Sequence, residues 1–164
     1  MRFALILAGS VAAVACTGEQ AVPPMLSAAI FRQTDTVRFE APFVVYQCDS
    51  APDLVLQGMR YGNGVLVWLR PRDSLAAGLP IVGLRDTVTR PAAVVSVRYN
   101  HQSVLHSLSL DSGSVTLRDS AGGRVITLAG SGLDVAFGVR AALMVTFPPR
   151  SLTADSTTSC SRIK

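Results

Sequence analysis

The sequence has few of the residues on which metal and catalytic sites are usually built. It contains two histidines, His101 and His106, and three cysteines without a Cys-x-x-Cys pair among them. A structural zinc site needs four closely spaced Cys or His ligands. Two histidines five residues apart also have opposite parity, so a continuous strand would separate them. We therefore predict neither a metal site nor a cofactor.

Charge of one sign is also scarce. The chain carries 15 Lys and Arg residues against 11 Asp and Glu residues, and Lys164 is the only lysine. The basic residues are scattered along the sequence, whereas a nucleic-acid-binding surface gathers cations that follow the phosphates. The composition therefore predicts no nucleic-acid partner.

The beginning of the chain is its most distinctive part. Met1-Arg2 is followed by an apolar run over residues 3–14, which leads into Ala13-Val14-Ala15-Cys16. A charged start, a short hydrophobic stretch and a small-residue cleavage site predict a secretory signal peptide over residues 1–15. The apolar run is too short for a transmembrane anchor, which takes about 20 residues.

The segment Ala13-Val14-Ala15-Cys16 resembles the lipidation motif of bacterial lipoproteins, although Ala13 stands where that family usually has Leu. The resemblance covers the signal segment only, and the domain that follows resembles no family. It implies that Cys16 is lipidated, becomes the first mature residue and anchors the protein to a membrane of the cell envelope. The alternative is ordinary signal-peptide cleavage, which would give a secreted protein with a free Cys16.

The other two cysteines form an even pair if Cys16 carries lipid. Export places Cys48 and Cys160 in a compartment where disulfides form. We therefore predict a Cys48–Cys160 disulfide, which would tie the C-terminal tail to an early strand. Two buried free thiols are the alternative.

These signals divide the chain into four parts. We expect a signal peptide over 1–15, a lipidated cysteine and tether over 16–34, a folded domain over 35–150, and a C-terminal tail over 151–164 held by the disulfide. Without residues 1–15 the charge is 14 basic against 11 acidic residues, since Arg2 is removed. The remaining length suits one domain with a single core.

The body of the chain has the pattern of an all-β protein. Apolar and polar residues alternate with period two, or form short apolar runs, which predicts strands over residues 36–46, 53–60, 65–69, 93–99, 104–110, 114–119, 124–129, 135–139 and 141–147. Turn residues separate these segments at 61–64, 111–113, 120–123 and 130–132.

This spacing favours an antiparallel β-sandwich of immunoglobulin-like, Greek-key architecture. We base that choice on the long connection over residues 70–92, which suits a Greek-key crossover better than an up-and-down barrel. A small β-barrel is the alternative.

No set of residues in the sequence forms a recognisable catalytic site. Asp111-Ser112-Gly113 is read as a turn, although Asp-Ser-Gly also surrounds the nucleophile of chymotrypsin-like proteases. The candidate binding residues are those aromatic and imidazole side chains best placed to form a surface, namely Tyr61, Trp68, Tyr99 and His106.

The sequence therefore predicts an envelope lipoprotein whose domain is a non-catalytic binding or structural module for a protein or glycan partner. One alternative is a β-barrel carrier of small apolar ligands, as in lipocalin-like proteins. Another is a hydrolase that brings together His106, Ser112 and an aspartate.

Overall fold

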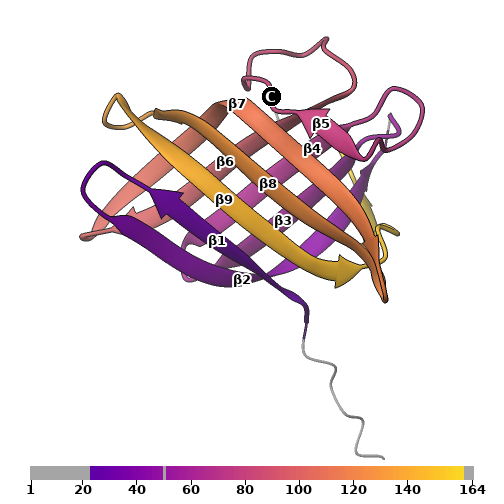
Figure 1. The fold of residues 1–164 in the computed structure, drawn as a ribbon, viewed down its shortest axis with the longest axis horizontal. Coiled ribbons are helices and arrows are strands. Elements are labelled where there is room, and N and C mark those ends of the chain that lie inside the picture. Colours follow the sequence, from indigo (N-terminus) through magenta and orange to yellow (C-terminus); the bar gives the residue numbers. More distant parts are fainter. Residues whose placement is uncertain (1–22, 50, 161–164) are drawn as a thin grey trace, which may run out of the picture.

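The computed structural model describes residues 23–49 and 51–160, and it is built from ten strands (Figure 1). These are β1 (Met25–Phe31), β2 (Thr36–Cys48), β3 (Leu54–Arg60), β4 (Asn63–Arg70), β5 (Gly78–Pro80), β6 (Ala92–His101), β7 (Val104–Ser120), β8 (Gly123–Asp134), β9 (Val139–Arg150) and β10 (Ser156–Thr158). The described residues form no helix long and apolar enough to cross a membrane.

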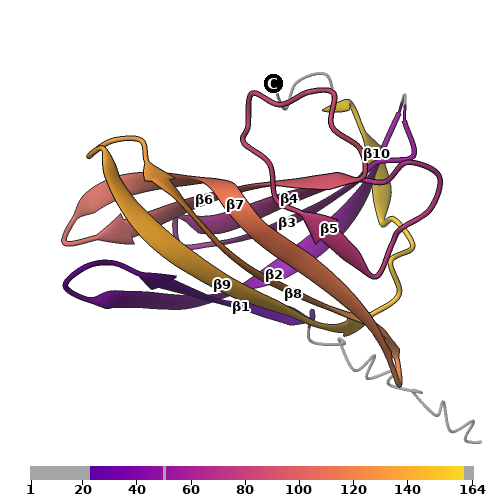
Figure 2. The same cartoon turned by 45° about the horizontal axis from the view of Figure 1, so that its top comes forward.

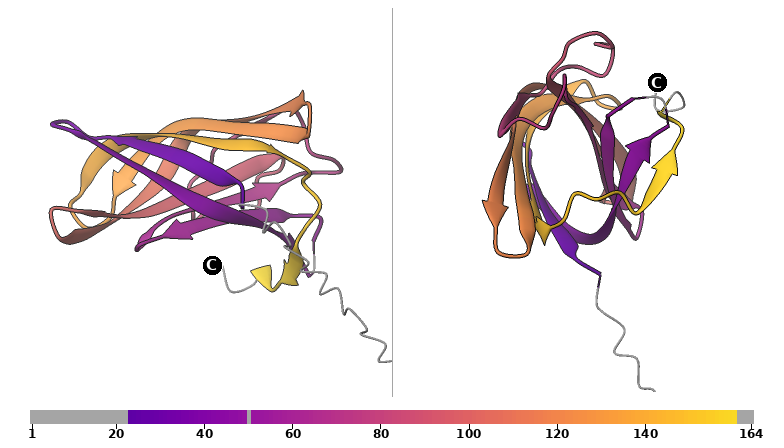
Figure 3. Two further views of the ribbon diagram at one scale, coloured as in Figure 1. Left: turned by 90° about the horizontal axis from the view of Figure 1, so that it is seen from below. Right: turned by 90° about the vertical axis from the view of Figure 1, so that its right-hand side faces the viewer.

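Eight of these strands close into an antiparallel barrel. Each of them pairs with the next along the chain, and β1 pairs with both β2 and β9, so that the ring has no open edge. Figure 3, right, shows this ring from the end of the barrel. The all-β prediction is confirmed. The predicted sandwich is wrong, and the barrel that stood as its alternative is the observed architecture.

The long connection misled the choice between these two folds because it is not a crossover. β4 pairs directly with β6 over Gly64–Arg70 and Ala92–Arg98. The residues between them lie along the outside of the barrel near one end (Figures 2 and 3). There β5 pairs with β7, and Leu79 and Ile81 join the barrel core. The connection therefore fills the gap in the barrel wall where β6 and β7 diverge.

Two predicted turns are wrong for a related reason. Residues 111–113 lie inside β7 and residues 130–132 lie inside β8, and the two segments pair with each other at a bulge between Leu110 and Ser112. A Cβ atom on Gly132 would lie 1.9 Å from the Ser109 carbonyl oxygen. Glycine allows the two backbones to approach closely as the long strands bend.

The inside of the barrel is packed with apolar side chains. Alternate residues of each strand point inward and form one cluster, whose buried members have exposed fractions between 0 and 6%. Leu26, Leu56, Leu69, Leu108 and Leu143 are fully buried in it. A cavity that held a ligand would expose its lining to a water-sized probe. The packing of these side chains leaves no such space around them.

The C-terminal segment closes a seam in the barrel wall. β2 is longer than β1, and β10 pairs in parallel with the part of β2 that extends past Met25. Asp155 lies beside β2, just before β10. Its backbone N–H donates to the Val45 carbonyl, and its carboxylate accepts from the Val45 N–H. The Cys48–Cys160 disulfide then fixes the end of this C-terminal segment to β2. The predicted cysteine pairing is confirmed.

The barrel also begins earlier than predicted. Met25–Phe31 lies within the expected tether of residues 16–34, yet it forms β1 and carries buried core residues. The expected signal peptide over 1–15 and Cys16 lie outside the described residues.

We predict that loss of the disulfide destabilises the barrel. The bridge joins residues 112 positions apart, and cross-links that close long loops stabilise proteins by about 2–4 kcal/mol. In a Cys16→Ser background, Cys48→Ser/Cys160→Ser should lower the free energy of unfolding in urea by that amount. Reducing agent should have the same effect on the parent and none on the double variant. Equal stability of the parent with and without reducing agent would contradict the prediction.

Candidate functional site

Polar side chains close the end of the barrel opposite the connection between β4 and β6. Tyr99, His106 and Asp134 come from β6, β7 and β8, and all three are buried. His106 Nδ1 lies 2.6 Å from Asp134 Oδ2, and the Tyr99 hydroxyl donates to the same oxygen over 3.2 Å. The three side chains therefore form one buried hydrogen-bonded group.

Asp134 also shapes the turn between β8 and β9. Its other oxygen, Oδ1, accepts a hydrogen bond from the Ala136 backbone N–H. This turn places Phe137 over His106, with the two rings 4.6 Å apart and nearly parallel, while Tyr99 stacks on the opposite face of the same imidazole. The turn is therefore held by both the carboxylate and the imidazole.

An ion pair lies next to this group, at the mouth of the barrel. His101 Nε2 is 2.8 Å from Asp35 Oδ2, and Arg32 approaches the other oxygen of Asp35. The rings of His101 and His106 are 6.1 Å apart. The parity argument applies to a continuous strand. Here a two-residue turn at Gln102 and Ser103 lies between the histidines and returns the chain, so both rings lie on the same face.

Large apolar side chains are exposed around this end of the barrel. We call them the tip surface. Their exposed fractions run from 41 to 65%, and they are Val104, Leu105, Leu133, Val135, Phe137 and Val139. The Val135 backbone N–H donates to the Ser107 carbonyl, which places the β8–β9 turn beside the start of β7. The tip surface therefore combines residues from two neighbouring hairpins.

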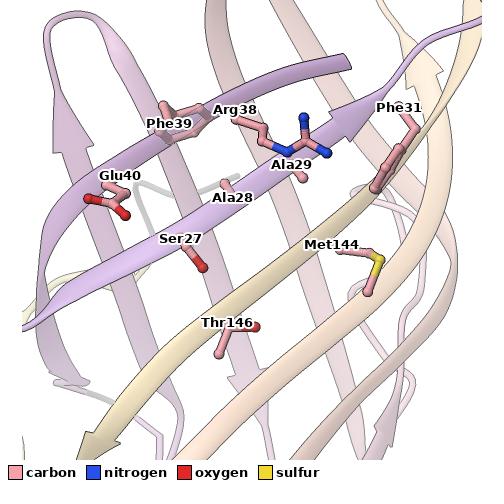
Figure 4. Close-up of a pocket in the computed structure, with 9 residues that line it drawn as sticks. All are labelled: Ser27, Ala28, Ala29, Phe31, Arg38, Phe39, Glu40, Met144 and Thr146. Carbon is pink, nitrogen blue, oxygen red and sulfur yellow. The ribbon is translucent and has the colours of Figure 1, made fainter. Parts of the chain in front are cut away.

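A groove of about 530 Å³ runs along the outer face of β1 (Figure 4). Its floor is made by the small side chains of Ser27 and Ala29. Arg38 on β2 and Met144 on β9 stand on the two sides of Ala29, because both residues are its partners in register. Phe31 lies farther along β1 and adds an aromatic ring to the lining.

The four predicted binding residues are not brought together. Tyr99 and His106 lie in the buried polar group, whereas Tyr61 is 84% exposed in the β3–β4 turn. Trp68 is on the outer face of β4, packed near the Cys48–Cys160 disulfide.

Trp68 belongs to a second polar group that sequence reasoning missed. Its indole N–H donates to the buried carboxylate of Asp53. Both terminal nitrogens of Arg90 donate to that carboxylate as well, and this bonding raises the pKa of Arg90. The group ties the long connection to the barrel wall, because Arg90 precedes β6.

The residues of the hydrolase alternative are also separated. Ser112 is exposed in the middle of β7, where its hydroxyl bonds Ser131. Six residues of strand separate it from His106, which corresponds to about 20 Å. Asp134 is the aspartate that reaches His106, and no spacing rule in the sequence linked these two residues.

Within the described part of the chain, no group of three or more His, Cys, Asp or Glu side chains is arranged to hold a metal ion. Comparison with protein-family models, with curated proteins and with solved structures finds no match for this chain.

Burial of Tyr99 predicts a pH dependence of stability. Desolvation, with a smaller contribution from the Asp134 carboxylate, raises the pKa of Tyr99 from 10.0 to about 12. The neutral phenol is thus favoured in the folded state, so its contribution is complete below pH 10 and is lost as the pH rises toward 12. Tyr99→Phe should reduce the fall in unfolding free energy between these two pH values, measured by urea titration with Trp68 fluorescence.

Tyr61→Phe provides the matched control for this measurement, because Tyr61 is exposed. It should leave the alkaline fall in stability as it is in the parent. If Tyr99→Phe and Tyr61→Phe gave the same slope, the Tyr99 phenol would not be the group responsible.

Proposed function

We propose that this protein is an envelope lipoprotein, anchored through Cys16, whose barrel is a non-catalytic binding module for a protein partner. The observation that carries the binding role is the packed interior of the barrel, which leaves the outer surface for recognition. The anchor is supported by the signal-like start of the chain and by Ala13-Val14-Ala15-Cys16.

The packed interior argues against the carrier alternative. An eight-stranded barrel can either fill with side chains or hold one small ligand. Phe43 and Phe147 meet edge to face inside the barrel, with ring centroids 5.0 Å apart, and both are buried. A carrier would need this space for its ligand.

The groove along β1 is the surface that we assign to the protein partner. Its small floor leaves room for an inserted side chain, and the methionine and phenylalanine beside it offer apolar contact. Arg38 and Glu40 line the same wall, so the partner segment should combine an apolar residue with a complementary pair of charges. A glycan would instead be expected to stack on exposed aromatic rings.

Metabolic labelling tests the anchor. In cells given labelled palmitate, the wild-type chain should incorporate the label and Cys16→Ala should not, because the thiol is the acceptor. Cys48→Ser is the matched control, since it removes a cysteine without removing the proposed acceptor. An unlabelled wild-type protein would refute lipidation and support plain secretion.

Site-specific photocrosslinking tests the groove. A photoreactive amino acid in place of Ala29 should give one adduct in cells of the source organism, whereas the same replacement at exposed Ala121 should not. Arg38→Glu should reduce the Ala29 adduct, because it reverses a charge on the groove wall. Equal adducts from both positions, or none from Ala29, would count against a partner in the groove.

A further inference from the structure

We propose that the tip surface is a lipid-binding site, through which the barrel docks onto the interfacial layer of an anionic bilayer. The inference rests on the envelope location given under the proposed function. It does not require lipidation of Cys16, because the contact is made by the barrel itself.

The apolar part of the site is formed by neighbouring hairpin ends. Val104 and Leu105 come from the start of β7, and Val135 and Phe137 come from the adjacent β8–β9 turn. These hairpin ends project from one end of the barrel (Figure 1). Exposed apolar patches mark protein or membrane contacts.

The turn that carries Val135 and Phe137 is held in place before any contact. Phe137 stacks on His106, and the Ala136 N–H is bonded by Asp134. The Val135 N–H is bonded to the Ser107 carbonyl. Docking therefore orders few additional groups, which lowers its entropic cost.

The charges around the tip surface favour a lipid surface. Arg98 on β6 pairs in register with Ser107 on β7, and Ser107 is in turn bonded to Val135. Arg98 forms no ion pair among the described residues. Arg60 lies over the exposed ring of Tyr61, and the Tyr61 carbonyl accepts a hydrogen bond from Asn100, so this turn belongs to the same end.

The acidic residue Asp35 at this end has partners of its own. Asp35 is paired with Arg32, and its carboxylate also contacts His101. Arg60 and Arg98 at this end form no ion pair with the acidic residues that the structure describes. They are therefore available to anionic headgroups, which attract arginines near a membrane surface.

A bilayer fits this surface better than a protein does. Five of the six tip residues are aliphatic, whereas protein-interface hot spots are enriched in Trp, Tyr and Arg clustered in pockets. Aliphatic side chains with flanking arginines and a tyrosine are the combination that binds membrane interfaces.

Flotation with lipid vesicles tests the proposal. The full chain without residues 1–15, with Cys16→Ser so that no acyl chain is present, should float with vesicles of equal phosphatidylcholine and phosphatidylglycerol. It should float less with phosphatidylcholine alone. Val135→Asp should reduce the bound fraction about tenfold, because it places a charge in the apolar layer.

Val88→Asp is the matched control, because Val88 is 85% exposed and lies in the long connection at the other end of the barrel. It should float like the parent. Arg98→Gln should weaken binding to anionic vesicles only, and Arg118→Gln, on the exposed face of β7 away from the tip, should not. Near-ultraviolet circular dichroism verifies that each variant is folded.

Two results would overturn the proposal. One is a parent protein that fails to float with anionic vesicles, which would leave the tip surface to a protein partner. The other is equal flotation of the parent and Val135→Asp. Neither result depends on palmitate labelling at Cys16, so a failure of the anchor and a failure of the tip surface are distinguishable.

Discussion

The pairing of β1 with two strands is the constraint on which the rest of this structure depends. β1 bonds β2 along one edge and β9 along the other, and this closes the sheet. A closed sheet has no free edge, and alternate residues of its strands then point toward one common interior. The mixed apolar and polar outer face follows from the same alternation.

Closure also explains why the chain adds two short strands, β10 and β5, to the barrel wall. β2 and β7 are longer than the strands beside them, so parts of both strands would lack a neighbour. β10 fills the place beside β2, and β5 fills the place beside β7. The disulfide and the Asp53 group, with Arg90 and Trp68, then fix these additions on the outer wall.

The sequence predicted most of the barrel strands, but it did not predict β1, the continuity of β7 and β8, or the closure of the sheet. Alternation in 36–41 and 93–99 predicts which side chains point inward, but it carries no information about which strand pairs with which. Asp111-Ser112-Gly113 and Gly130-Ser131-Gly132 have the composition of turns, and here that composition permits close strand contact. The disulfide was predictable from cysteine parity, whereas the Asp134 contacts depend on the closed ring.

The proposed anchor and the tip surface lie at opposite ends of β1. The proposed anchor, Cys16, precedes Met25 by residues that can span up to about 30 Å when extended. The tip surface lies at the other end of the barrel, near the turn that follows Phe31, and β1 itself spans about 20 Å. Residues 16–24 are thus long enough for the anchor and the tip to reach one bilayer together. The groove along β1 lies between the two proposed membrane contacts, because β1 runs from the anchor side at Met25 to the tip side at Phe31.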